Sequence, residues 1–494
     1  MNITELIVFI LYFLIVLAIG LYFFFRTKSG GEKSYFLGGR EMGGFVSALS
    51  AGASDMSSWV LMGLPASIFT AGLGQVWIAV GLAIGTVLSW ILVAPRLRRF
   101  SIVSGDSITL PQYLTNRFKT SNKALQIICA IIFLCAYTVY AASSIKACGT
   151  LFHTVFDGEG IDHSTLYMYI AAAIIIAYTF LGGFSAVCWT DFFQGLLMLA
   201  ALMLAPIIAL FAVNNGTVAA ATAEVGENYW NLLPSGKFDW ESISAILTGL
   251  AWGLGYFGMP HIIIRYMAIK SPKEVKKSRI VGSIWTCLIL VFSVAVGLIG
   301  RVLLGDSIDD SSVVFISMVR MLFPALISGI LLSAILAAAM STADSQLLAS
   351  ASAFASDVYK PVFRKNAGDK EMMWMGRIVV IIISIIAVII AANPNSGSIM
   401  SLVENAWGIF GAAFGPVVIL SLFWRKFTFG GAIAGIVAGG VVDVLWLIFL
   451  GGTGLYELLP GFVAGIIAAI VVSLIKGPSE EVKQLFDEAK AYDK

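Results

Sequence analysis

The sequence predicts an all-α polytopic membrane protein with thirteen transmembrane helices. Three observations lead to this prediction: the overall composition, the recurrence of long apolar runs, and the placement of basic residues between those runs. Of the 494 residues, 59% are hydrophobic and 12% are charged, whereas a soluble protein has about 45–50% apolar and about 25% charged residues. The mean hydropathy is +0.91. This composition excludes a chain of soluble domains.

Apolar runs of about 20 residues match the ~30 Å hydrocarbon core of a bilayer at 1.5 Å rise per residue. We expect one transmembrane domain over residues 1–478 and a short cytosolic tail over 479–494, which could form a short helix but is expected to be solvated. The chain begins MNITEL without a basic region, so we expect no cleavable signal peptide. The thirteen expected spans are 3–25, 41–71, 73–95, 124–156, 164–182, 186–213, 240–269, 280–304, 321–357, 374–393, 399–424, 428–451 and 457–476.

The basic residues test this order of spans independently. If the N-terminus is outside, the cytoplasmic segments and the helix ends next to them contain all but five of the 31 lysines and arginines. This asymmetry is the positive-inside rule, and it predicts a multi-pass protein of the cell membrane with its N-terminus outside and its C-terminus in the cytoplasm. The expected cytoplasmic segments are 26–40, 96–123, 183–185, 270–279, 358–373, 425–427 and the tail.

Several other classes of protein are disfavoured. The net charge is only +2, which argues against nucleic-acid binding. The five cysteines form no C-x-x-C pair, and only three histidines exist, of which His153 and His163 flank one loop. We therefore expect no zinc, haem or redox site and no organic cofactor. No nucleophile, base and orienting group cluster in the sequence, so an enzyme is not expected.

Two spans are interrupted in corresponding places. Span 2 contains SALSAGASDMSSW (47–59), and span 7 contains AWGLGYFGMPH (251–261), with three glycines and a proline. Glycine weakens a helix by about 1 kcal/mol and proline by about 3 kcal/mol, and backbone freed inside a bilayer survives only when buried in protein or lining a cavity. Close packing of small residues is the alternative interpretation.

The two breaks are five spans apart, and an odd shift reverses the direction of a helix across the membrane. Spans 2–6 (about 41–213) and 7–11 (about 240–424) are therefore expected to form two inverted repeats, with the remaining three spans peripheral. Paired interruptions of this kind indicate a transporter binding site at the midplane.

Two polar clusters stand out against this background. Asp55 lies in the first break beside Ser54, Ser57 and Ser58, and an acid at a helix centre costs about 2.5–3.5 kcal/mol to insert. We expect it to bind a cation or hold the site open, with a passive polar contact as the alternative. Other intramembrane charges, at Lys146, Asp344, Glu404 and Asp443, are equally compatible with structural and functional roles.

The second cluster lies in span 9, where Ala338, Ser341 and Thr342 share one helix face. Together with unwound backbone around Ala53 and Met56, the two hydroxyls could form an oxygen cage for a monovalent cation. Such hydroxyls can instead bond back to their own helix.

At these residues the sequence resembles the sodium/solute symporter family, and in particular its proline-transporting members. The resemblance runs nearly end to end, and it implies a LeuT-type core of inverted repeats. The matching segments are YFLGGR (35–40), SALSAGASDMSSW (47–59), LMGLP (61–65), WGLGYFGMPH (252–261), GILLSAILAAAMST (329–342) and FGAAFGPVV (410–418).

The resemblance implies a role for each matching position. The implied Na⁺ site is formed by Ala53, Met56, Ala338, Ser341 and Thr342. Arg40 matches a residue linked to coupling, and Asp191 an acid on the sodium path. The substrate candidates are Asp55, Ser57, Ser58, Trp59, Tyr140, Trp252, Tyr256 and Pro260. Ser58 stands where the family has glycine, and Met259 where it has glutamine; both could alter substrate choice.

The implied function is Na⁺-coupled uptake of L-proline by alternating access, with Na⁺, L-proline and the lipid bilayer as partners. Trp252 and Tyr256, four apart, could cover an apolar ring. A symporter for pantothenate, a sugar or another carboxylate is the nearest alternative, and a membrane sensor or a channel is the alternative from a different class. The oligomeric state is left open.

Overall fold

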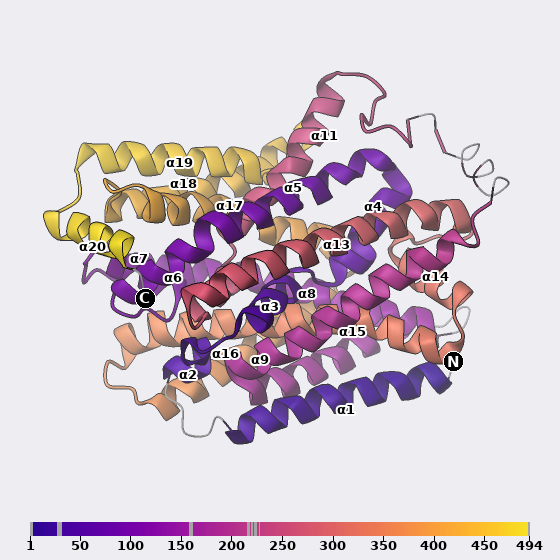
Figure 1. The fold of residues 1–494 in the computed structure, drawn as a ribbon, viewed down its shortest axis with the longest axis horizontal. Helices are drawn as coiled ribbons and strands as arrows, with labels where there is room; N and C mark the ends of the chain where they lie inside the picture. The colour runs from indigo at the N-terminus through magenta and orange to yellow at the C-terminus, as the bar shows by residue number, and fades with distance from the viewer. Residues whose placement is uncertain are drawn as a thin grey trace.

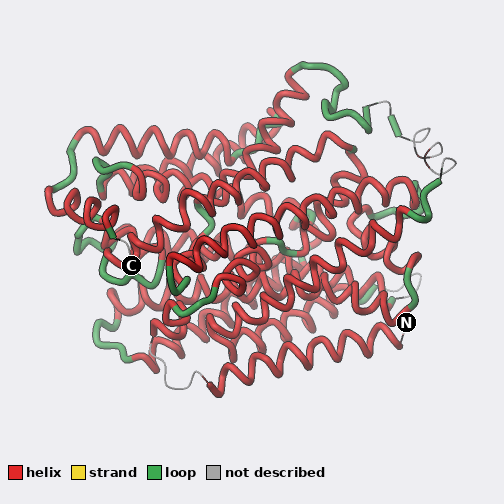
Figure 2. The backbone as a smooth tube through the Cα atoms, in the orientation of Figure 1, coloured by secondary structure: helices red, strands yellow, loops and turns green. Residues whose placement is uncertain are grey.

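The computed structural model describes residues 3–26, 32–157, 162–214, 218, 221, 225–226 and 228–492. Parts of the predicted loops 26–40 and 157–163, and the last two residues of the tail, lie outside this range. Within it, the secondary structure is helical, apart from an isolated parallel bridge between Met42 and Ile269. Figure 2 shows helices joined by loops that gather at the ends of the molecule. The all-α prediction is confirmed.

The first half of the chain contains nine labelled helices. They are α1 (Ile3–Arg26), α2 (Glu32–Leu37), α3 (Gly44–Asp55), α4 (Leu64–Ala71), α5 (Val76–Leu88), α6 (Ala94–Val103), α7 (Leu110–Arg117), α8 (Ala124–Phe156) and α9 (Ser164–Leu210). A π-helical turn at Trp59–Gly63 leads directly into α4, and a second one at Ser89–Val93 joins α5 to α6.

The second half is equally helical. Its helices are α11 (Trp240–Ala251), α12 (Pro260–Ala268), α13 (Pro272–Leu304), α14 (Val314–Leu322), α15 (Ala325–Ser352), α16 (Asp369–Ala392), α17 (Ile399–Phe423), α18 (Phe429–Leu450), α19 (Leu458–Ile475) and α20 (Glu480–Ala491). A 3₁₀ turn (Trp252–Phe257) continues α11, and a π-helical segment (Ala353–Phe363) continues α15.

Many of these helices are long and apolar enough to cross a bilayer. Among the described residues there are ten such helices, or eleven when the bent pair Trp240–Phe257 and Pro260–Ala268 is taken as one span. Two predicted spans, 41–71 and 164–182, are not recovered as single spanning helices, because the first is broken after Asp55 and the described apolar helix of the second is Ser164–Ala177. The chain is thus a polytopic membrane protein, and the count of thirteen stays a prediction.

The long helices lie side by side, with the two termini at opposite ends of the bundle (Figure 1). α15 is central and packs against α1, α8 and α9, while α3 packs against α9 and α13. α17 lies between α8 and the α18–α19 pair. This arrangement surrounds α3 and the second broken helix with protein.

The outer faces of the peripheral helices are apolar. Leu14 on α1, Ile389 on α16 and Ile467 on α19 are 56%, 66% and 56% exposed. Exposed apolar side chains on this scale mark a surface that is covered in its native setting, and here that covering is the lipid of the bilayer.

The boundaries of two predicted spans differ from the observed helices. Gly183, with φ 68° and ψ 175°, interrupts α9 where the sequence predicted the turn 183–185, in a conformation that glycine adopts readily. The span predicted to begin at 321 begins at Ala325, because Phe323 and Pro324 separate it from the short helix α14.

The tail forms the short helix that the sequence allowed, and one face of this helix is buried rather than solvated. Residues 480–491 form α20, which buries Val482, Leu485 and Phe486 and packs against α6 and α7. The ring of Phe486 meets that of Phe100 at 5.3 Å. The helix is amphipathic, and its apolar face explains why it docks on the bundle.

Candidate ion and substrate site

The first broken helix stops at Asp55. Met56 makes the last bond of α3, to the carbonyl of Gly52 at 2.8 Å, and then leaves helical geometry with ψ 70°. The carbonyl of Asp55 accepts from the Ser57 N–H at 2.8 Å, from the Trp59 indole at 3.1 Å and from the Tyr140 hydroxyl at 3.4 Å. Side chains thus satisfy backbone that the break has freed, as the bilayer interior requires.

The second broken helix has a different construction. α11 tightens into the 3₁₀ turn 252–257, and the extended Met259 (ψ 108°) separates this turn from α12, with a bend of 43°. The glycines here permit close packing: a Cβ on Gly255 would lie 2.1 Å from the Trp407 indole, and one on Gly258 would lie 2.5 Å from the Phe410 carbonyl. The turn is therefore pressed directly against α17.

The two breaks meet through Asp55 and Tyr256. The Tyr256 hydroxyl donates to Asp55 Oδ2, and the two residues are 2% and 1% exposed. Asp55 Oδ1 has no hydrogen-bond partner among the described residues. A buried carboxylate with one free oxygen is poised to accept a donor or a cation.

Aromatic rings gather around this contact. Trp59 and Trp252, one from each break, have ring centroids 6.3 Å apart. Tyr456 stacks on Trp252 at 5.2 Å, and Trp407 lies edge-on to Tyr256 at 5.3 Å. The Trp407 indole also donates to the Trp252 carbonyl at 2.8 Å. Such a cluster offers apolar faces with a few polar groups, as small-molecule sites do.

The hydroxyl pair of α15 lies against the first break. The Ser341 hydroxyl is 2.8 Å from the carbonyl oxygen of Ala53 and 3.2 Å from that of Ala338, and the Thr342 hydroxyl is 3.5 Å from the Ala53 carbonyl oxygen. Four of the five oxygens predicted for an ion site are therefore close together. Met56, the fifth residue, is buried at the end of α3. Neutral oxygens in this number suit a hard cation.

The remaining predicted substrate residues line the same two breaks. Ser57 accepts the N–H of Trp59 at 3.4 Å. The Ser58 hydroxyl is buried and has no hydrogen-bond partner among the described residues. Pro260 is the first residue of α12 and is buried.

Asp191 is more deeply placed than its position near a predicted helix end indicated. It is fully buried, and its Oδ2 accepts from Ser50 at 2.7 Å and from the Arg265 guanidinium at 3.2 Å. Arg265 also donates to Ser345 at 2.5 Å. This network joins α3, α9, α12 and α15, and Ser345 lies about one turn along α15 from the hydroxyl pair.

Arg40 lies at the end of the bundle that the sequence predicts to be cytoplasmic. It donates to the Met267 carbonyl at 2.6 Å and to Asp106 at 2.8 Å. Burial favours a raised pKa for Asp106, but the hydrogen bond from Lys33 and the charge of Arg40 outweigh it and hold the pKa below its usual value. Beside Arg40, the amide of Met42 bonds to the Ala268 carbonyl at 3.2 Å. These contacts fasten the start of span 2 to the end of span 7.

Sequence reasoning did not single out Arg265, Trp407 or Tyr456. Arg265 left a signal, because it is a basic residue within a predicted span. Trp407 and Tyr456 left none, since single aromatic residues in apolar helices usually pack against neighbours and only the fold brings these two to the second break.

Comparison with known proteins agrees with this geometry. A model of the "Sodium:solute symporter family" matches residues 35–439. The osmoregulated proline transporter OpuE of Bacillus subtilis is 43% identical over 482 residues, covering 96% of both chains. The sodium/proline symporter of Escherichia coli is 42% identical over 496 residues, covering 99% of this chain and 96% of that one.

A solved structure shares the fold. A Na⁺-coupled sialic acid symporter superposes with a TM-score of 0.80 at 21% identity, covering 97% of this chain and 99% of the other. At that identity the likeness concerns the fold, which belongs to the LeuT type. The match of the family model and the identity to full-length relatives together show that this chain belongs to the sodium:solute symporter family.

Proposed function

We propose that this protein is a symporter that couples the entry of Na⁺ to the uptake of L-proline. One observation carries the proposal: the short segment from Ala53 to Trp59 contacts both the hydroxyl pair of α15 and, through Asp55, the aromatic residues of the second break. An ion and a solute bound at these places would share one piece of backbone. The relatives named above are described as proline transporters, and both they and the family point to a transporter rather than an enzyme.

The proposal includes the architecture that the sequence predicts. The chain would cross the membrane thirteen times, with repeats over about 41–213 and 240–424, and would have its N-terminus outside and its C-terminus in the cytoplasm. The positions of the termini at opposite ends of the bundle support an odd number of crossings (Figure 1). The asymmetry of basic residues supports the orientation.

Na⁺ would be held by the carbonyl oxygens of Ala53, Met56 and Ala338 and by the hydroxyls of Ser341 and Thr342. In the structure Ser341 donates its proton to the Ala53 carbonyl. A cation between these two oxygens would replace that hydrogen bond, because both oxygens would then turn their lone pairs to the ion. Binding would tie α3 to α15 and fix the geometry of the break after Asp55.

L-Proline is a zwitterion with an apolar ring. Trp59, Trp252 and Tyr256 would cover the ring, while Asp55, Ser57 and Ser58 would address its polar end beside Tyr140 and Pro260. Binding of both ligands would favour closure of the outer side and release of the cytoplasmic contacts made by Arg40, with Asp191 on the path of the ion. Because this is coupling between two sites, proline must tighten Na⁺ binding by the same factor by which Na⁺ tightens proline binding.

The driving force suffices for strong accumulation. A membrane potential of about −150 mV supplies roughly 3.5 kcal/mol per charge, and a tenfold Na⁺ gradient adds about 1.4 kcal/mol. With one Na⁺ per proline, the sum of about 5 kcal/mol supports more than a roughly thousandfold concentration ratio.

Uptake into proteoliposomes containing only this protein tests the proposal. We expect an inward Na⁺ gradient to drive accumulation of labelled L-proline, and a K⁺ gradient of the same size to fail. If unlabelled pantothenate or a sugar inhibited the uptake of labelled proline more strongly than unlabelled proline does, another solute would be the substrate. Ser58 and Met259, which differ from the family pattern, are the residues that favour this second candidate. Proline flux that equilibrates without accumulation under a Na⁺ gradient would overturn the proposal in favour of a channel.

A further inference from the structure

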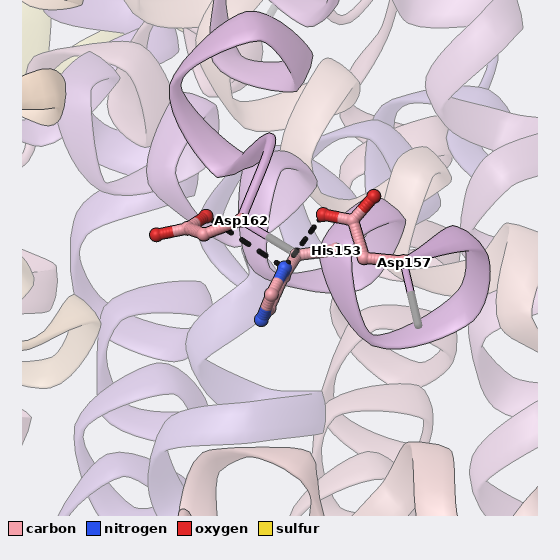
Figure 3. Close-up of side chains that lie close together, drawn as sticks. All are labelled: His153, Asp157 and Asp162. Atoms are coloured by element: carbon pink, nitrogen blue, oxygen red, sulfur yellow. Dashed lines mark hydrogen bonds and ion pairs between the residues drawn. The ribbon is translucent and has the colours of Figure 1, made fainter. Parts of the chain in front are cut away.

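A second constellation of ligand-type side chains lies far from the two breaks, where α8 ends and α9 begins. It contains His153, Asp157 and Asp162, whose potential ligand atoms all lie within 4.8 Å of one another. Figure 3 shows the imidazole of His153 between the two carboxylates. We propose that these three residues bind a divalent transition-metal ion of the zinc type at this end of the molecule, which the sequence predicts to be extracellular.

The separations suit such an ion. His153 Nδ1 lies 2.8 Å from Asp157 Oδ2 and 3.7 Å from Asp162 Oδ1. Zinc binds imidazole nitrogen and carboxylate oxygen at about 2.0–2.2 Å, so adjacent ligands of a tetrahedral ion lie about 3.4 Å apart. The two measured separations bracket this spacing. Small side-chain rotations therefore suffice to admit an ion, with water completing its coordination.

The supporting structure is in place for the buried ligand. Asp157 is four residues after His153, so the two share one helix face, and its side chain is 4% exposed. Asp157 Oδ1 accepts from the Tyr167 hydroxyl at 2.7 Å and from the ring Nδ1 of His163 at 3.0 Å. Asp157 Oδ2 accepts from the backbone N–H of His163 at 2.8 Å. Such outer hydrogen bonds orient ligating carboxylates at metal sites.

Access and charge also favour an ion. The side chains of His153 and Asp162 are 41% and 73% exposed, so an ion can reach them from solvent. Two carboxylates and a neutral imidazole carry a charge of −2, which a divalent cation balances. The imidazole ligand selects against Mg²⁺ and Ca²⁺, which prefer oxygen.

This proposal revises the expectation that three histidines are too few for a zinc site. The count of histidines and cysteines does not reveal the carboxylates of Asp157 and Asp162, which the fold brings to His153. A bound ion would link the end of α8 to the start of α9. The inference does not depend on the proposed transport function.

Titration calorimetry on the purified full-length protein, after removal of metals with a chelator, tests the proposal. We expect saturable binding of one Zn²⁺ per chain and no comparable binding of Mg²⁺ or Ca²⁺. His153→Gln retains a hydrogen-bond donor toward Asp157 but removes the imidazole, and it should weaken Zn²⁺ binding at least tenfold, as should Asp162→Asn. Asp309→Asn, which changes a different exposed acid, should bind as the unmodified protein does.

Thermal unfolding provides a second measurement that does not rely on calorimetric heats. Zn²⁺ should raise the midpoint of the unmodified protein and of Asp309→Asn, because a ligand that binds the folded state stabilises it, and at the same Zn²⁺ concentration it should raise the midpoint of His153→Gln less. Equal Zn²⁺ affinity in His153→Gln and the unmodified protein, or no saturable binding in either, would overturn the proposal.

Discussion

The two broken helices lie at the same position in their predicted repeats, yet they are built differently. The first break is polar: Asp55 and three serines surround it, and its freed carbonyl oxygens accept from Trp59, Tyr140 and Ser341. The second break is small and aromatic: its glycines let the turn 252–257 press against Trp407 and Phe410. The two breaks are joined directly by the hydrogen bond from Tyr256 to Asp55.

This difference indicates that the two breaks have different roles. The first break presents mainly oxygen atoms, so under the proposed function it would hold Na⁺ and the polar end of proline. The second presents mainly ring faces and would cover the ring of proline. We therefore expect substitutions of the oxygen ligands at the first break to change the response to Na⁺, and substitutions around the second break to change the response to proline without changing the response to Na⁺.

The largest effect is expected for Asp55→Asn. The substitution removes the charge that accepts the Tyr256 hydroxyl, and hydrogen bonds to charged groups contribute about 1.5–3 kcal/mol, which corresponds to roughly ten- to hundredfold. Loss of the free oxygen Oδ1 adds to this, so we expect at least a roughly hundredfold lower initial rate of Na⁺-driven proline uptake in proteoliposomes.

Ser54→Ala is the matched control for this substitution. The Ser54 hydroxyl donates to the Ala51 carbonyl within its own helix at 3.1 Å, so its removal should reduce uptake by no more than about fivefold, since a neutral hydrogen bond contributes about 1 kcal/mol. Undiminished uptake by Asp55→Asn would remove this carboxylate from the mechanism and with it the polar role of the first break.

Sequence reasoning located both breaks and nearly all of the spans, because helix breakers and long apolar runs are local signals. It also placed Ser341 and Thr342 on one face of α15. It could not supply partners from distant segments. The burial of Asp191 against Arg265, the indole of Trp407 on the Trp252 carbonyl, and the docking of α20 depend on packing between elements far apart in the chain.

An intermediate effect is expected for Ser341→Ala. The substitution deletes one of the five proposed ion ligands, and we expect the Na⁺ concentration for half-maximal uptake to rise about tenfold, equivalent to about 1.4 kcal/mol. Ser333→Ala on the same helix is the control, because the Ser333 hydroxyl bonds back to Gly329 at 2.8 Å. An unchanged Na⁺ dependence in Ser341→Ala would place the ion elsewhere.

The smallest effect, and the one that separates the two breaks most sharply, is expected for Trp407→Phe. It keeps an aromatic ring beside Tyr256 but removes the hydrogen bond to the Trp252 carbonyl, a loss of about 1 kcal/mol. We expect a roughly fivefold rise in the proline concentration for half-maximal uptake, with the Na⁺ dependence at saturating proline unchanged. Trp77→Phe removes a similar bond, to the Leu232 carbonyl at 3.0 Å, between residues outside both breaks, and should alter neither. If Trp407→Phe shifted the Na⁺ dependence as strongly as the proline dependence, the second break would handle charge too, and the division between the two would fail.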